Sequence, residues 1–194
     1  EDETPDGVNF ITAGIDVHDD RFECEVVGWG ANEESWSLDY FSLHGNLSKP
    51  EIWNVLAEFL RKSYRKSDGT ILNIMLACID SGGHFTDEVY DFSKRNGLKW
   101  VIPVKGSSQP GRPVAQLPNQ KNAKGVFLTA VGTDTAKEII YSRYVISEHG
   151  NGYCHYPLRD SYNETYFRGA VAEWKKKRTK AGQTQYYWHC PDGK

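Results

Sequence analysis

The sequence is poor in cysteine and methionine and has no long apolar run. Its only methionine is Met75, and its four cysteines form no Cys-x-x-Cys pair and match no zinc-binding pattern. The longest nearly apolar run, residues 71–79, is interrupted by Asn73 and is far shorter than the roughly 20 residues that cross a bilayer. These absences exclude a membrane-spanning helix and predict a reduced, cytoplasmic protein.

The chain also lacks an initiator methionine, an apolar signal segment and a GxxxxGK[ST] phosphate loop. We therefore expect a fragment of a longer protein, without ATPase activity of its own. Its length of 194 residues fits one ordinary domain, with 39% hydrophobic and 25% charged residues. The net charge of −3 argues against a strongly basic nucleic-acid module, but it allows an enzyme with one local basic patch.

The residue pattern predicts an α/β fold. Period-two alternation predicts an antiparallel meander of three strands, and two nearly apolar later segments predict parallel strands flanked by helices. A helix with buried Ile139, Ile140 and Tyr144 is expected further on, and a β-hairpin with a lysine-rich first arm near the end. The predicted strands are residues 8–17, 21–30, 35–43, 72–80, 99–104 and 126–131. A first helix is predicted to begin at Pro50, and further helical segments are predicted at residues 86–96, at 133–145 and within 162–174.

Two acids follow predicted strands. Asp16 ends the first strand and Asp80 ends the fourth. If these strands are parallel neighbours, both carboxylates emerge at one end of the sheet, where their repulsion is relieved by Mg²⁺ or Mn²⁺. Gly82 and Gly83 would let a phosphate backbone approach closely. The alternative is that each aspartate only caps the turn that follows it.

This topology resembles the ribonuclease-H-like fold, whose nucleases place metal-binding acids at these two positions. Seven short segments extend the resemblance over nearly the whole chain, to the C-terminal nuclease domain of the large terminase subunit of lambda-like tailed phages. The segments are TAGID (12–16), GWG (28–30), ESW (34–36), DSGGHFT (80–86), PVKG (103–106), GTDTAK (132–137) and GYCHYP (152–157).

The resemblance implies a single ribonuclease-H-like nuclease domain, residues 1–194, of a motor-nuclease that works in the host cytoplasm. Such a protein cuts concatemeric viral DNA to genome ends with two Mg²⁺ or Mn²⁺ ions. In this chain the resemblance implies that Asp16 bridges the two ions and that Asp80 binds one of them. The implied partners are double-stranded DNA, the ATPase domain, a small terminase subunit and the procapsid portal.

The family's third metal-binding acid lies on a helix after the hairpin, and this chain stops before such a helix. Asp160 and Glu164 are the alternatives within the chain, although neither matches the family motif. A DNA-binding or motor-docking module that is inactive alone is therefore a second interpretation. Another ribonuclease-H-like enzyme, an integrase or a resolvase, is a third.

Several basic residues complete the candidate site. Lys105 could contact phosphate as a catalytic group, or be a solvated lysine at a strand end. His84 could support the metal site or touch DNA, or simply open a helix. His18 is expected to point away from Asp16, to the other face. A basic run is predicted to neutralise DNA phosphates, unless it is only a solvated arm; it comprises Lys175, Lys176, Lys177, Arg178 and Lys180.

Overall fold

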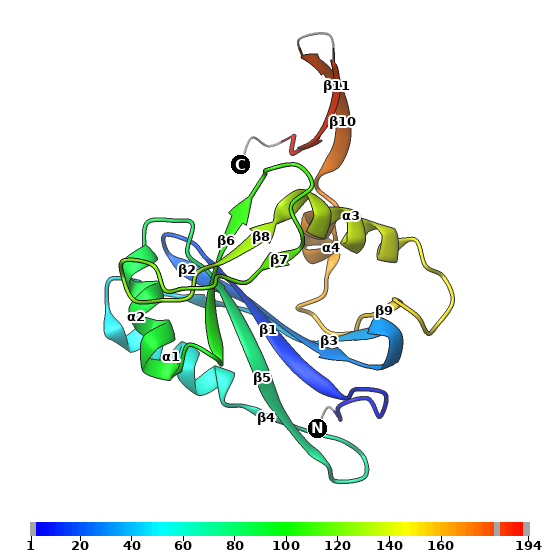
Figure 1. Ribbon diagram of the computed structural model, residues 1–194. Coiled ribbons are helices and arrows are strands. Elements are labelled where there is room, and N and C mark those ends of the chain that lie inside the picture. The colour runs from blue at the N-terminus through cyan, green and yellow to red at the C-terminus, as the bar shows by residue number, and fades with distance from the viewer. Residues whose placement is uncertain (1–2, 181–182, 192–194) are drawn as a thin grey trace.

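The computed structural model describes residues 3–180 and 183–191. One large mixed sheet has the strand order β7-β8-β6-β5-β1-β2-β3-β9, with β4 paired to β5, and a separate hairpin contains β10 and β11 (Figure 1). No helix among the described residues is both long and apolar enough to cross a membrane. The strands are β1 (Phe10–Val17), β2 (Arg21–Trp29), β3 (Ser35–His44), β4 (Ser63–Arg65), β5 (Ile71–Asp80), β6 (Val101–Ser107), β7 (Ala115–Gln116), β8 (Thr129–Gly132), β9 (Cys154–His155), β10 (Trp174–Lys180) and β11 (Gln183–His189); the helices are η1 (Ala31–Glu33), α1 (Pro50–Leu60), α2 (Thr86–Asn96), α3 (Thr133–Tyr144) and α4 (Glu164–Ala170).

The strand directions confirm the predicted mixed sheet. Strands β1, β2 and β3 pair antiparallel in chain order, because short turns join them. Strand β5 then pairs parallel with both β1 and β6, and β6 pairs parallel with β8. The carboxyl ends of β1, β5, β6 and β8 therefore meet at one edge of the sheet. This arrangement, with flanking helices and a C-terminal hairpin, is consistent with the ribonuclease-H-like fold.

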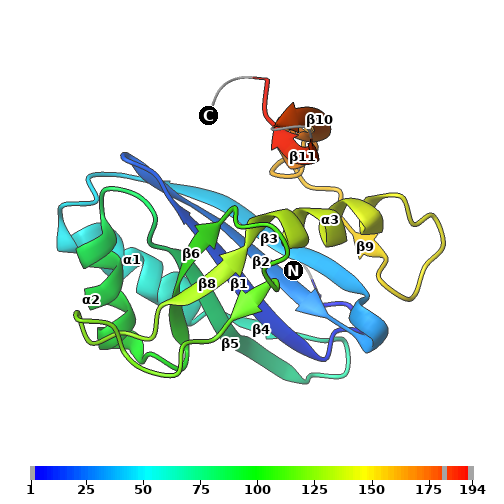
Figure 2. The ribbon, with the colours of Figure 1, turned by 45° about the horizontal axis from the view of Figure 1, so that its top comes forward.

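The main core lies between one face of the sheet and helices α1 and α2. Alternate residues of β1 and β2 are fully or almost fully buried there, as the period of two requires. Trp53 of α1 sits at the centre: its ring is 4.7 Å from that of Phe22 and 5.4 Å from that of Phe92 in α2. Figure 2 shows both helices on the same side of the molecule, away from the β10–β11 hairpin.

Two sequence predictions about the helices differ from the structure. Helix α1 ends at Leu60, and the basic stretch after it forms β4 rather than a last helical turn. Helix α3 is present, but Ile139 and Ile140 are 38% and 44% exposed, so their predicted burial is wrong. The reason is the position of α3. It follows the short strand β8 and contacts the large sheet chiefly there, so none of its residues is buried in the core.

Helix α4 depends on one capping side chain. The Asn163 Oδ1 accepts hydrogen bonds from the backbone N–H groups of Thr165 and Tyr166, at 2.9 and 3.2 Å. We expect Asn163→Ala to cost about 1 kcal/mol, because both donors lose their acceptor. Thermal unfolding should then begin about 2–4 °C lower. Asn163→Asp keeps the acceptor and should stay near the wild-type Tm; an unchanged Tm for the alanine variant would contradict the capping role.

Candidate active site at the sheet edge

The parallel register of β1 and β5 places Asp16 beside Asp80. The strands align Gly14 with Cys78 and Ile15 with Ile79, so the next residue of each strand is an aspartate at the same edge. Ile15 and Ile79 are buried in the core against α1 and α2. Because successive side chains alternate, both carboxylates lie on the opposite face of the sheet. The structure thus brings the two predicted acids together, as the strand order requires.

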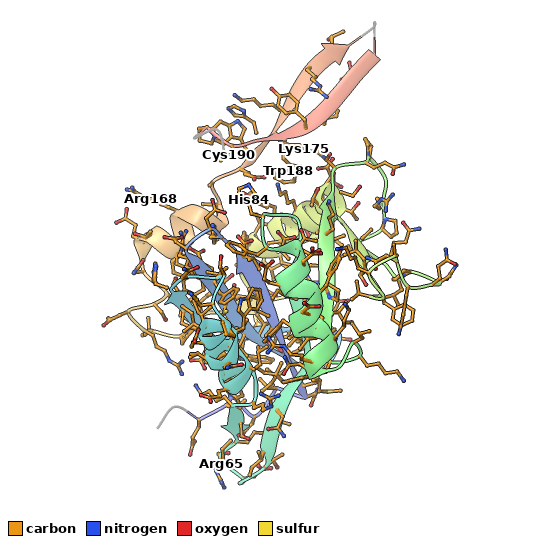
Figure 3. The ribbon with its side chains drawn as sticks, turned by 90° about the vertical axis from the view of Figure 1, so that its left-hand side faces the viewer. Arg65, His84, Arg168, Lys175, Trp188 and Cys190 are labelled. Atoms are coloured by element: carbon orange, nitrogen blue, oxygen red, sulfur yellow. The ribbon has the colours of Figure 1, made fainter. Side chains whose placement is uncertain are left out.

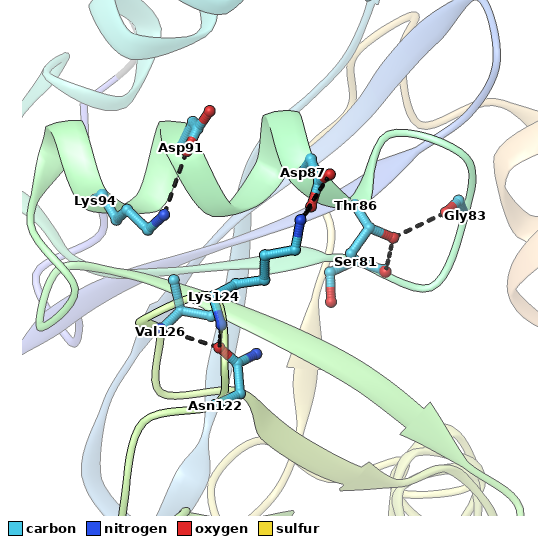
Figure 4. Close-up of polar contacts among 9 residues, drawn as sticks. All are labelled: Ser81, Gly83, Thr86, Asp87, Asp91, Lys94, Asn122, Lys124 and Val126. Carbon is cyan, nitrogen blue, oxygen red and sulfur yellow. Dashed lines mark hydrogen bonds and ion pairs between the residues drawn. The ribbon is translucent and has the colours of Figure 1, made fainter.

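The loop after β5 holds Asp80 while leaving its carboxylate accessible. The Gly82 N–H donates to Asp80 Oδ1 at 3.1 Å, so the turn-capping role foreseen as an alternative is present. A Cβ at Gly82 would lie 3.3 Å from both carboxylate oxygens, so the glycine keeps that side uncrowded. The Thr86 hydroxyl donates to the carbonyl oxygens of Ser81 and Gly83, which closes the loop before α2 (Figure 4).

His18 and Glu23 lie beside Asp16, and neither was predicted there from the sequence. His18 Nε2 is 3.1 Å from Asp16 Oδ2, so the prediction that it points away is wrong. Residues two positions apart in an extended strand share a face, and this spacing was the signal. Glu23 pairs directly across from Asp16 in the β1–β2 register and lies 3.9 Å from the same histidine nitrogen.

A row of partly buried hydrogen bonds anchors the glutamates of β2. Glu23 accepts from Arg21 Nε at 2.9 Å and from the Tyr40 hydroxyl at 3.3 Å. Glu25 accepts from the Tyr166 hydroxyl of α4 at 2.7 Å. Burial, and then the charge of Glu23, raises the pKa of Tyr40; burial and then Glu25 raises the pKa of Tyr166. Both phenols therefore remain protonated donors, and they hold this face of the sheet in place next to Asp16.

The residues at this edge fit a hard divalent cation only as a partial ligand set. The Asp16 side chain is 59% exposed, and the His18 Nε2 beside it is shielded from solvent without a hydrogen bond to the described residues. Among those residues, no three His, Cys, Asp or Glu side chains are arranged to hold a metal. Mg²⁺ is commonly held by one or two carboxylates together with water and substrate phosphate, and Asp16 and Asp80 can supply that share.

His84 and Lys105 contribute less directly to this edge. His84 Nδ1 lies 2.8 Å from Asp19 Oδ1, and the pair links the loop after β5 to the β1–β2 turn. Val104, not Lys105, aligns with Asp80 in the β5–β6 register. Alternation therefore directs the exposed Lys105 towards the other face of the sheet, and its phosphate contact stays a prediction.

The two alternative acids lie on the segment that leads into α4. Asp160 is exposed in the loop before the helix. Glu164 is in the first turn of α4 and forms a 2.8 Å ion pair with Arg168, with both side chains about 80% exposed. Such an i,i+4 surface pair accounts for Glu164 without a metal. Their role as ligands stays untested.

The basic run lies on the β10–β11 hairpin and divides between its two faces. Lys175 and Lys177 alternate with Lys176 and Arg178 along β10, and the Lys180 side chain lies outside the described part of the structure. Two cations lie over aromatic rings: Arg178 is 5.0 Å from the Tyr187 ring centroid, and Lys176 is 5.2 Å from that of Trp174. In Figure 3, Lys175, Trp188 and His84 lie towards one end of the molecule and Arg65 at the other.

Comparison with known proteins gives one consistent family. The family model described as "Terminase large subunit gpA, endonuclease domain" matches residues 1–194. The chain is 38% identical over 189 residues to the large terminase subunit of Escherichia phage lambda, covering 95% of this chain and 30% of that protein. It is 42% identical over 139 residues to the large terminase subunit of Enterobacteria phage P21, covering 72% of this chain and 22% of that protein. The chain thus spans at most 30% of these relatives, and no solved structure matches it.

Proposed function

The chain belongs to the terminase large subunit gpA endonuclease-domain family, and from this membership we propose that it is a metal-dependent DNA endonuclease that cuts concatemeric viral DNA to genome ends during packaging. The observation that carries the proposal is the placement of Asp16 beside Asp80 at the ends of two parallel strands. In the host cytoplasm its partners would be double-stranded DNA, an ATPase domain, a small terminase subunit and the procapsid portal.

Asp16 and Asp80 are the residues that would hold Mg²⁺ or Mn²⁺, with Asp16 shared between two ions. When bound, such ions supply an activated water and neutralise charge on the scissile phosphate. The chain's own part is to bring two carboxylates together and to support Asp16 with His18, 3.1 Å away. Gly82 and Gly83, which carry no side chain, let a phosphate backbone approach Asp80.

A second function is favoured by one observation. No third acidic ligand joins Asp16 and Asp80 within the part of the chain that the structure describes. Two closely spaced divalent ions need more negative charge than two carboxylates provide. The chain alone would then act as a DNA-binding or motor-docking module, whose cleavage requires residues supplied from elsewhere.

Plasmid cleavage separates the two functions. We expect supercoiled plasmid to be nicked in Mn²⁺ and left intact in EDTA, while binding of a duplex oligonucleotide is measured in parallel by fluorescence anisotropy. An endonuclease converts the supercoiled form at a rate that rises with Mn²⁺ concentration. Duplex binding without nicking at any Mn²⁺ or Mg²⁺ concentration would reject the endonuclease for this chain and support the module.

A further inference from the structure

A cavity of about 590 Å³ lies between the β10–β11 hairpin and the main body of the protein. Three consecutive aromatic residues of β11, Tyr186, Tyr187 and Trp188, line it together with Arg178 of β10. Asp134 and Lys137 of α3 line it from the other side. The volume is within the range of sites that bind small organic ligands, roughly 300–1,000 Å³.

We propose that this cavity, the base pocket, binds an unpaired nucleobase of a DNA strand. The proposal rests on the proposed function for the presence of DNA, and it adds a substrate feature: a strand that is locally single. Aromatic side chains bind bases through their flat faces, which every base has, and cations beside the rings bind the backbone phosphates. A base inside an intact duplex has no free face to offer, because its neighbours cover both.

The aromatic side chains are already supported in place. The Trp188 ring centroid is 4.8 Å from that of Tyr141 in α3, and the Lys137 ammonium is 6.0 Å from the Trp188 ring. The Arg178 guanidinium lies over Tyr187 at 5.0 Å. Tyr187 thus has a cation beside its ring, the combination that single-strand-binding surfaces use for a base and its phosphate.

Charge orients the ligand within the base pocket. Arg178 is a cation on the hairpin side and attracts a phosphate there. Asp134 is an anion in the first turn of α3 and repels a phosphate, but its carboxylate can accept a hydrogen bond from an N–H group of a base. The base therefore points towards α3, with the backbone along the hairpin.

The base pocket lies at the same edge of the sheet as the acid pair. Its lining includes Ser108, directly after β6, and Thr133, directly after β8. Both strands run parallel to β5 and β1, which end at Asp80 and Asp16. A strand with one base in the pocket would thus have its neighbouring nucleotides at the edge where the carboxylates lie.

The test measures binding in EDTA, so that cleavage plays no part. Three fluorescent DNA probes of equal phosphate number are compared by anisotropy: oligodeoxythymidine, an abasic tetrahydrofuran oligomer and a blunt duplex. We expect the wild type to bind oligodeoxythymidine at least about 5-fold more tightly than the abasic oligomer, the lower end of what base–aromatic stacking gives. Equal affinity for these two probes would overturn the proposal.

Variants of Tyr187 identify the pocket as the source of the preference. Tyr187→Leu should bring the preference for bases to less than 2-fold and leave duplex affinity within 2-fold, whereas Tyr187→Phe keeps the ring and should keep the preference. Lys177→Gln is the matched control, because Lys177 is a cation of the same strand that does not line the pocket. It should change both single-strand affinities by the same factor.

A folded Tyr187→Leu variant that retains the full preference would reject the base pocket, and circular dichroism establishes folding. The outcome is separable from that of the proposed function. Loss of the base preference with plasmid nicking intact would reject only the pocket. A base preference without Mn²⁺-dependent nicking would reject only the endonuclease.

Discussion

Asp16→Asn and Asp80→Asn are each expected to reduce DNA cleavage by at least about 1,000-fold. Asparagine keeps the size of the side chain but removes the charge that a divalent cation needs from its oxygen ligands. Losing the several kcal/mol of charge stabilisation that a bound ion supplies corresponds to a rate loss of this order. The measurement is the initial rate of supercoiled plasmid nicking against Mn²⁺ concentration. Nicking at the wild-type rate by either folded variant would refute the role of that carboxylate.

A matched control is available on helix α2. Asp91 is a surface carboxylate, 71% exposed, that pairs with Lys94 at 3.4 Å and faces neither strand end (Figure 4). Asp91→Asn removes the same charge from the net balance of the protein. Its cleavage rate should stay within about 2-fold of the wild type, because a single exposed pair contributes little. A large loss in Asp91→Asn would mean that net charge, not the acid pair, controls activity.

Thermal stability gives a readout of the acid pair that does not need cleavage. Asp16 and Asp80 end neighbouring strands at the same edge, and Glu23 lies across from Asp16 in the β1–β2 register. In EDTA their mutual repulsion opposes folding, and Asp16→Asn should therefore have a Tm equal to or above that of the wild type. Mn²⁺ should raise the Tm of the wild type and not that of the variant, because a ligand stabilises only the state that binds it.

The sequence was sufficient to predict the acid pair because both acids end strands with clear patterns. Period-two burial in β1 and the nearly apolar β5 give the strands, and the short turns after β1 and β2 give the antiparallel meander. The parallel pairing of β1 with β5 was a condition of that prediction, and the resemblance to the ribonuclease-H-like fold made it the expected arrangement. The structure shows this pairing, and it places Asp16 and Asp80 at the same edge.

The remaining features could not be predicted because tertiary neighbours decide them. Strands β7 and β9 contain two residues each, too few to produce a periodic pattern, and exist because β8 and β3 offer an edge. The apolar residues Ile139 and Ile140 lie in a helix as predicted, but helical spacing does not determine whether another element packs against them, and both are exposed. Glu23 becomes a neighbour of Asp16 only through the β1–β2 register. His18 differs, because strand alternation alone is enough to put it on the same face as Asp16. The prediction that it points to the other face applied that rule wrongly.

The division of the basic run between two faces predicts unequal salt effects. Lys175 pairs with Glu138 of α3, so part of the charge on the face of β10 that carries Lys175 and Lys177 is already neutralised. Lys176 and Arg178 lie on the other face, where the only charge partners within the described residues are aromatic rings. Duplex phosphates should therefore be bound mainly by Lys176 and Arg178.

Two double variants test this division. Lys176→Gln with Arg178→Gln should flatten the dependence of log affinity on log salt by up to about 1.8, since each lost phosphate contact on duplex DNA removes about 0.9. Lys175→Gln with Lys177→Gln removes the same charge but should change the slope by less than half as much. The measurement is duplex affinity by anisotropy between about 50 and 200 mM salt, where such contacts dominate. An unchanged slope in both variants would mean that the cations of the hairpin do not contact duplex phosphates. Equal large changes would mean that the duplex contacts both faces.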